Sequence, residues 1–309
     1  MNSPLLRSAY RLPSGQARRY FSNTPLVRLP LAYNLHQPSP LQDAPLNHPI
    51  IFMHGLFGSK QNNRSISKAL ARDLNRPIYA IDLRNHGDSP HAPRHDYTAM
   101  AEDVEKFIHE HKIERPTLIG HSMGAKTAMT VALRHPDLIA NLIPVDNAPI
   151  DAALKSDFGK YVRGMKKVEE ANVSKQKEAD AILEEYEESL PIRQFLMMNL
   201  IRDSNTGKYH FRIPIKTLAN ALDDMADFPF KNPDEVRYEG PTLFIRGTNS
   251  HYLADDALPV IGKFFPRFEL RDVESGHWVI SENPEAFREE NMVLKPGRSS
   301  DNFTVTIHA

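Results

Sequence analysis

A serine between two glycines is the first feature of this sequence that could do chemistry. Ser122 lies in Gly120-His121-Ser122-Met123-Gly124, directly after a short apolar run and directly before a segment with helical spacing. The glycines permit a tight, strained turn in which larger side chains would collide with neighbouring backbone. Such a turn places the hydroxyl at the end of a strand and at the N-terminus of a helix, where the dipole favours negative charge. The pattern predicts that Ser122 is a nucleophile.

A histidine must accept the proton of this hydroxyl, because serine is a weak nucleophile without an adjacent base. In proteins with this serine turn, the chain order is serine, acid, histidine, so the histidine follows the last strand. Two histidines, His277 and His308, lie in that part of the sequence. His277 comes just after an apolar segment ending at Val273, where a loop at the sheet edge would face the serine. We therefore expect His277 to be the base.

The segments that would position these residues alternate between short apolar runs and amphipathic stretches. This alternation predicts an α/β fold, a mostly parallel twisted sheet with helices on both faces. Strands are predicted at residues 50–53, 78–82, 117–119, 142–145, 242–245 and 268–273, with one or two antiparallel strands near 27–35. Helices are predicted at residues 64–74, 97–110, 123–134, 254–264 and 284–292.

The strand–helix alternation stops after Asp146 and resumes at Pro241. Two sets of apolar residues in this interval follow helical spacing on a highly charged background. They are Phe158, Tyr161, Val162, Met165 and Val168, and then Ala179, Ile182, Leu183, Tyr186 and Leu190. We interpret the interval, about 150–238, as a helical cap inserted after the sixth strand. Its apolar stripes serve mainly for packing, although a cap must also present apolar surface to a pocket.

Four motifs together resemble the α/β-hydrolase superfamily. They are His54-Gly55 after the first long strand, the run DLRNHGDSPH at 82–91, the serine motif, and Gly276-His277-Trp278. The runs HGLFGSK and GHSMGAKTAM, together with DLRNHGDSPH, narrow the resemblance to the mitochondrial abhydrolase-domain-containing protein eleven group and its fungal relatives, which include yeast ethanol acetyltransferase. The resemblance covers roughly residues 49–287. It implies an α/β-hydrolase fold and acyl chemistry on esters or thioesters.

The carboxylate that orients the histidine is less obvious. The usual acid position, a few residues after the strand at 242–245, is occupied by Ser250. Asp146 ends the preceding strand, so its side chain would emerge at the same sheet edge, and it matches the acid position in the resembled group. We expect Asp146 to be the acid, with Asp255 or Asp256 as the alternative.

Acyl transfer also requires hydrogen-bond donors for the negative charge that develops on the carbonyl oxygen. The expected donors are the backbone N–H of Met123, which follows the nucleophile, and the N–H of Leu56. Gly55 and Gly58 would let the Leu56 loop approach a substrate closely. A phosphate-binding interpretation of this loop fails because it lacks the Gly-Lys-Ser/Thr ending of a P-loop.

Neither a metal nor an organic cofactor is predicted. His86, His91 and His95 lie close to Asp88 and Asp96 in the sequence, but intervening prolines indicate a turn-rich loop rather than a metal site. With no cysteine, thiolate catalysis and cysteine-ligated zinc are excluded. The formal net charge of −1 gives no reason to expect binding to nucleic acid, and no apolar run is long enough for an integral membrane segment. Protein partners stay unknown.

The two ends of the chain predict separate segments. Residues 1–42 contain no acidic residue but five arginines, Arg7, Arg11, Arg18, Arg19 and Arg28, which is typical of a mitochondrial transit peptide. Residues 19–22 resemble a matrix-processing site with cleavage after Phe21, so we expect a transit peptide at 1–21 and a mitochondrial, matrix location. The hydrolase domain is expected at 27–295. Residues 296–309 read as a polar tail that departs from the family pattern.

Taken together, the sequence predicts a serine-dependent acyl hydrolase, either a carboxylesterase or a thioesterase. The expected small-molecule substrate is a short acyl ester or thioester, which would form an acyl-enzyme on Ser122 that water then hydrolyses. Two alternatives stay open. An alcohol could replace water, which would make the protein an alcohol acyltransferase that forms esters such as ethyl acetate from acyl-CoA. A non-catalytic mitochondrial scaffold or binding protein could also retain the fold.

Overall fold

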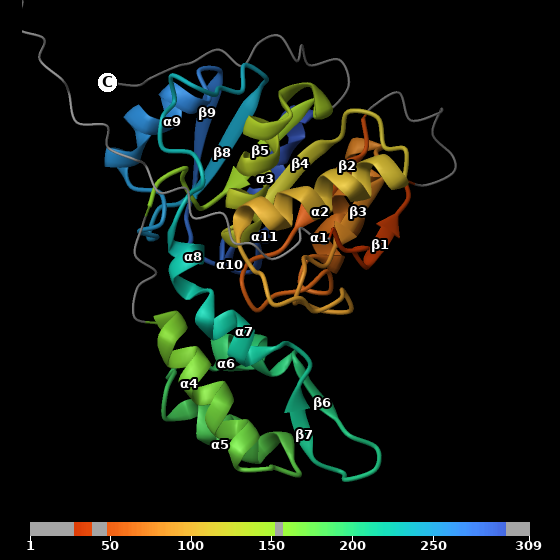
Figure 1. The fold of residues 1–309 in the computed structure, drawn as a ribbon. Coiled ribbons are helices and arrows are strands. Elements are labelled where there is room, and N and C mark those ends of the chain that lie inside the picture. The colour runs from red at the N-terminus through yellow and green to blue at the C-terminus, as the bar shows by residue number, and fades with distance from the viewer. Residues whose placement is uncertain (1–27, 39–47, 152–156, 295–309) are drawn as a thin grey trace, which may run out of the picture.

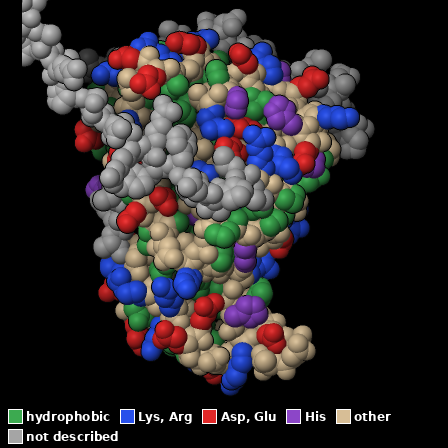
Figure 2. Space-filling view, in the orientation of Figure 1, with side chains coloured by type: hydrophobic (Ala, Val, Ile, Leu, Met, Phe, Trp, Pro, Cys, Tyr) green, Lys and Arg blue, Asp and Glu red, His purple; other side chains and the backbone are tan. Residues whose placement is uncertain are grey.

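A computed structural model describes residues 28–38, 48–151 and 157–294. The expected transit peptide at 1–21 and polar tail at 296–309 lie outside these described residues. Within them the chain forms two lobes, a sheet with helices and a smaller lobe at one edge of that sheet (Figure 1). On the face seen in Figure 2, acidic and basic side chains are interspersed over both lobes. No helix in the described residues is long and apolar enough to cross a bilayer.

The large lobe is built on a seven-stranded sheet of order β1-β3-β2-β4-β5-β8-β9 (Figure 1). Its strands are β1 (Tyr33–His36), β2 (Ile50–Met53), β3 (Ile78–Ile81), β4 (Thr117–His121), β5 (Asn141–Val145), β8 (Thr242–Gly247) and β9 (Phe268–Val273). β1 is antiparallel to β3, and all other neighbours are parallel. The carboxyl ends of the parallel strands therefore meet at one edge, where ligand sites of open α/β sheets form.

Helices cover both faces of this sheet because successive strand residues point in opposite directions. These helices are α1 (Arg64–Leu74), α2 (Tyr97–Glu110), α3 (Met123–Arg134), α9 (Leu258–Phe264), α10 (Val279–Glu282) and α11 (Pro284–Glu290). Ile50 and Phe52 of β2 belong to a buried cluster with α1, α10 and α11. Ile51 and Met53 belong to a second cluster with α2, α3 and α9. Burial on both faces of the sheet explains why β2 is a continuous apolar run.

The small lobe, the cap, lies in the chain between β5 and β8. It contains α4 (Asp157–Glu170), α5 (Gln176–Glu184), α6 (Leu190–Met197), α7 (Ile215–Asn220) and α8 (Leu222–Ala226), with a hairpin of β6 (Leu200–Arg202) and β7 (Tyr209–Phe211). The hairpin was not expected, since strands of three residues are too short to show an alternating pattern. The cap was expected after the sixth strand. It follows the fifth strand of the described residues, β5, because residues 28–38 contribute one strand, β1, rather than two.

Two buried histidines hold together the loops that follow β2 and β3. The Nε2 atom of His54 accepts a hydrogen bond from the Leu83 N–H, and that of His86 accepts one from the Phe57 N–H, each at 3.1 Å. The Nδ1 atom of each ring lies within 2.9 Å of a backbone carbonyl. Both rings must therefore be neutral and carry their proton on Nδ1.

Burial favours this neutral state. It lowers the pKa of His54, and burial together with the neighbouring His54 and His95 holds the pKa of His86 well below its usual value. Protonation would replace each acceptor nitrogen by a donor that faces a backbone N–H. The loop geometry at the sheet edge thus depends on uncharged histidines.

We expect His86→Gln to weaken the acid sensitivity of the fold. A histidine that is neutral when folded, but has a pKa of about 6.5 when unfolded, stabilises the fold fully above that pH and loses this contribution below it. Between pH 7.5 and pH 5.5 this loss is about 1.4 kcal/mol per histidine. Urea unfolding at both pH values should show a loss of unfolding free energy smaller by that amount in His86→Gln, because glutamine accepts the same hydrogen bond without titrating.

The matched control is His109→Gln, which changes an exposed histidine on α2. It should retain the wild-type difference between the two pH values. An equal difference in wild type and His86→Gln would show that His86 is not held neutral.

Candidate active site

Ser122 occupies a strained turn between β4 and α3. Its backbone φ of 55° and ψ of −113° lie in a region that residues other than glycine rarely adopt. A Cβ on Gly120 would lie 2.2 Å from the Gly124 carbonyl oxygen, and a Cβ on Gly124 would lie 2.7 Å from the His54 carbonyl oxygen. Both positions therefore need glycine. The Ser122 N–H donates to the Val145 carbonyl of β5, which fixes the turn against the next strand.

The structure brings Ser122, His277 and Asp146 together into one chain of hydrogen bonds. The His277 Nε2 atom lies 2.9 Å from the Ser122 Oγ atom, and its Nδ1 atom lies 2.6 Å from Asp146 Oδ2. His277 reaches this position from the loop between β9 and α10. The carboxylate holds the ring in the tautomer whose Nε2 atom can accept the serine proton.

The Asp146 carboxylate is fully buried and has further partners. Its Oδ1 atom accepts from the Gly247 N–H at 3.1 Å, and its Oδ2 atom accepts from the Ser250 hydroxyl. Ser250 thus occupies the usual acid position and hydrogen-bonds the acid that comes from the neighbouring strand. These donors compensate the charge of a carboxylate removed from water.

The alternative acids lie elsewhere. Asp255 pairs with Arg246, and its side chain is 84% exposed. Asp256 is exposed as well. Neither residue hydrogen-bonds His277, whose described carboxylate partner is Asp146.

The two expected oxyanion donors flank the nucleophile turn. Met123 is the first residue of α3, and Leu56 lies in the loop after β2. This loop approaches the serine closely, since a Cβ on Gly55 would lie 3.3 Å from the Ser122 Cβ atom. Within the described residues, neither the Leu56 N–H nor the Met123 N–H donates to another protein group. Both donors are therefore available to a substrate oxygen.

Phe57, the residue after Leu56, connects this loop to the cap. Its φ of 63° places a bulky residue in the left-handed region. Its carbonyl accepts a hydrogen bond from the Asn199 side chain of the cap at 2.8 Å, and its N–H donates to His86. Its ring packs against that of Phe158 on α4, with centroids 6.0 Å apart. Asn199 carries no signal in the sequence that could have identified it.

Aromatic rings enclose the His277 imidazole. The Tyr252 ring stacks on it with centroids 3.8 Å apart, and the His121 Nε2 atom lies 2.7 Å from the His277 carbonyl oxygen. Burial lowers the pKa of His121 to about 4, so its ring is neutral and donates this hydrogen bond. Phe195 of the cap packs against Trp278, with centroids 4.6 Å apart. The His277 ring thus packs against Tyr252 and His121, and the cap reaches it through Trp278, whose ring centroid lies 5.9 Å from that of His277.

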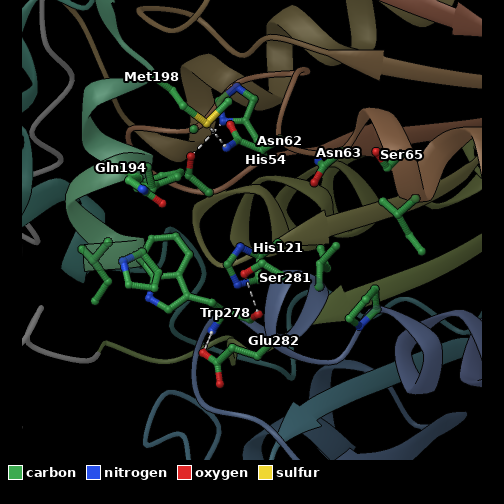
Figure 3. A pocket seen from close by; sticks show the side chains of 18 of the residues that line it. His54, Asn62, Asn63, Ser65, His121, Gln194, Met198, Trp278, Ser281 and Glu282 are labelled. Carbon is green, nitrogen blue, oxygen red and sulfur yellow. Dashed lines mark hydrogen bonds between the residues drawn. The ribbon is translucent and has the colours of Figure 1, made fainter. Parts of the chain in front are cut away.

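A cavity of about 930 Å³ lies beside these residues (Figure 3). Ser122 and His277 are not among its lining residues, but the lining includes Gly55 and His121, which adjoin the serine turn, together with His54 and Trp278. Its walls come from α1, from α6 of the cap and from α10 with α11. A substrate could therefore extend from the serine turn into apolar space.

The part of the chain that the structure describes contains no group of three histidine, aspartate or glutamate side chains arranged to hold a metal. His86 and His95 instead lie among the loops at the sheet edge, with ring centroids 5.5 Å apart. The groups gathered around Ser122 suit proton transfer and nucleophilic attack. Their arrangement can take a proton from a hydroxyl and stabilise an anion on a carbonyl oxygen.

Comparisons with known proteins agree with this geometry. Residues 48–284 match the family model described as alpha/beta hydrolase fold. A probable alcohol acetyltransferase of Saccharomyces cerevisiae is 42% identical over 252 residues, which cover 76% of this chain and 73% of that protein. The sn-1-specific diacylglycerol lipase ABHD11 of Mus musculus is 38% identical over 270 residues, which cover 86% and 85% of the two chains.

A solved structure shows the same architecture. A marine microorganism esterase superposes with a TM-score of 0.78 at 31% sequence identity, covering 86% of this chain and 99% of its own. The parallel sheet, the strained serine turn and the family match over most of the chain lead to one conclusion. This protein belongs to the α/β-hydrolase fold family.

Proposed function

We propose that the protein is a serine-dependent acyl hydrolase that acts on small-molecule ester or thioester substrates. The observation that carries this proposal is the continuous chain of hydrogen bonds from Ser122 through His277 to the buried Asp146. Family membership supports it, as do the esterase and lipase named among the similar proteins.

In the first half of the reaction, the Ser122 oxygen attacks the carbonyl carbon while His277 Nε2 takes the hydroxyl proton. The carbonyl electron pair moves to oxygen, and the N–H groups of Leu56 and Met123 stabilise the resulting anion. Collapse of this tetrahedral intermediate breaks the bond to the alcohol or thiol. The protonated His277 returns the proton to the leaving group, and Asp146 stabilises the imidazolium throughout.

In the second half, a water molecule attacks the acyl-enzyme. His277 takes a proton from this water, and collapse of the second intermediate releases the carboxylic acid and restores the Ser122 hydroxyl. An alcohol that takes the place of water gives a new ester by the same steps. The similarity to an alcohol acetyltransferase makes this transfer the second candidate activity.

Substitution Ser122→Ala should abolish covalent labelling by a fluorophosphonate probe and lower esterase kcat by about a millionfold or to background. The reason is that alanine lacks the attacking oxygen, while the surrounding turn and its hydrogen bond to Val145 stay intact. Labelling of the wild-type protein, followed by mass mapping of the modified residue, checks the assignment. A folded wild-type protein that neither labels nor hydrolyses p-nitrophenyl acetate would favour the non-catalytic scaffold.

Product analysis separates hydrolysis from transfer. An acyl thioester is supplied with and without ethanol, and the acid and ethyl ester are quantified. A hydrolase gives mostly acid in both reactions, whereas ethyl ester as the main product would assign the acyltransferase activity.

We expect Asn199→Leu to lower kcat about ten- to a hundredfold with a smaller change in KM. Leucine has a similar volume but leaves the Phe57 carbonyl without its donor, so the Leu56 N–H should move out of alignment. The affinity for a trifluoromethyl ketone, which mimics the tetrahedral intermediate, should fall in parallel with kcat/KM. The control is Asn205→Leu in the exposed turn between β6 and β7. An unchanged ketone affinity in Asn199→Leu would contradict this role.

We further propose that this activity resides in mitochondria, on the basis of the arginine-rich, acid-free N-terminal composition. A fluorescent protein fused after residue 30 should co-localise with mitochondria, and N-terminal sequencing of the imported protein should begin at Ser22. The control fusion changes Arg7, Arg11, Arg18 and Arg19 to glutamine. Cytosolic fluorescence of the unchanged fusion would refute the location.

A further inference from the structure

The cavity beside the serine turn extends between the cap and the core. Ile192, Phe195 and Met198 on or next to α6 form one wall, and Ile66 and Ala69 of α1 form the opposite wall. Figure 3 shows Gln194 and Met198 on the cap segment, with His121 and Trp278 next to each other below them. Met198 is 52% exposed, so the apolar wall continues to the surface.

The size of this cavity exceeds the needs of a short acyl group. At about 930 Å³ it lies near the upper end of the range of roughly 300–1,000 Å³ found for sites of drug-sized ligands. An acetyl group and an ethanol molecule would leave most of this volume unfilled. The cavity therefore fits a substrate with one long arm.

One polar group points to the chemistry of this arm. Asn63 is the N-cap residue of α1, but its side chain does not cap the helix. The residue is 4% exposed and lines the cavity, and its Nδ2 atom has no hydrogen-bond partner within the described residues. A buried donor without a partner is costly, and an acceptor oxygen on a bound molecule would satisfy it.

The charged groups along the cavity favour an uncharged ligand. Glu282 accepts hydrogen bonds from the Gly276 and Trp278 N–H groups. Arg288 pairs with Asp73 and Glu285. Within the described lining residues, these pairings leave no unpaired arginine or lysine to bind a carboxylate or phosphate.

We propose that this cavity binds the long arm of the substrate, an uncharged apolar chain that carries an acceptor oxygen for the Asn63 amide. A carbonyl, an ether or a hydroxyl oxygen would meet this requirement. The proposal rests on the proposed function, because the arm extends from a carbonyl held at Ser122. It deepens that function by assigning a substrate class, esters or thioesters with a second oxygen on a long arm.

The first test measures kcat/KM for p-nitrophenyl acetate and p-nitrophenyl octanoate. Ala69→Phe places a large ring in the cavity and should lower the octanoate-to-acetate ratio at least about tenfold. Lys68→Phe, which adds the same ring at an exposed position of α1, should keep the wild-type ratio. An equal ratio in wild type and Ala69→Phe, with both proteins folded, would overturn the assignment of the cavity to the arm.

The second test examines the Asn63 donor without turnover. Calorimetry on Ser122→Ala measures the binding of methyl octanoate and of analogues that carry one ketone at successive chain positions. At least one ketone should bind more tightly than the plain ester, and adding Asn63→Leu should remove this advantage, about fivefold. A ketone advantage that persists with leucine at position 63, or that no analogue shows, would overturn the role of Asn63.

The two tests distinguish a failure of the proposed function from a failure of the proposed arm site. If the wild-type protein lacks serine-dependent turnover but the ketone advantage depends on Asn63, the proposed function fails while the binding site stands. Turnover could instead depend on Ser122 while Ala69→Phe leaves the octanoate-to-acetate ratio unchanged and Asn63→Leu leaves the ketone advantage unchanged. In that case the proposed function stands and the arm site is refuted.

Discussion

The hydrogen bond between the His277 ring and the Asp146 carboxylate is the interaction on which the rest of the site depends. It fixes the tautomer in which Nε2 faces Ser122, and it requires a hydrogen-bonded carboxylate at a fully buried position. The Gly247 N–H and the Ser250 hydroxyl make this possible by donating to both oxygens. The acid thus comes from β5, while the loop after β8, in the usual acid position, supplies a donor.

The cap also helps to hold the groups around Ser122 and His277 in position. Asn199 donates to the carbonyl of Phe57, next to the proposed oxyanion donor Leu56, and Phe195 packs on Trp278, next to the proposed base His277. At the C-terminal end of α8, the buried Lys126 amine donates to the carbonyls of Ala226 and Asp227. Burial lowers the pKa of Lys126 to about 8, while the nearby Asp151 and Asp227 carboxylates oppose this shift. Movement of the cap would therefore disturb both the oxyanion loop and the base.

Much of this site could be predicted from the sequence because its chemistry imposes local patterns. A buried strand followed by a glycine-flanked serine has few other structural solutions, and the order of acid and histidine follows from the sheet topology. The contributions of Ser250 and Asn199 could not be predicted, since each depends on contact between residues far apart in the chain. The spacing of His86 and His95 in the sequence could not by itself reveal the role of these side chains. The fold shows that His86 accepts a hydrogen bond from a backbone N–H. The cap strands β6 and β7 have three residues each, which is too short for an alternating apolar pattern in the sequence.

The choice between water and alcohol must be made outside the catalytic groups. Ser122, His277 and Asp146 perform the same proton transfers for either acceptor, so their geometry is compatible with both activities. What can distinguish water from an alcohol as the acceptor is the space around the acyl-enzyme. Ser122 is 7% exposed, and the nearby cavity has largely apolar walls, to which α1 and α6 contribute. Such a space disfavours isolated water, but it also excludes small alcohols when a long arm fills it. Either acceptor must reach the acyl-enzyme through this space, so the size and the apolar walls of the cavity, rather than the triad, bear on which acceptor is used.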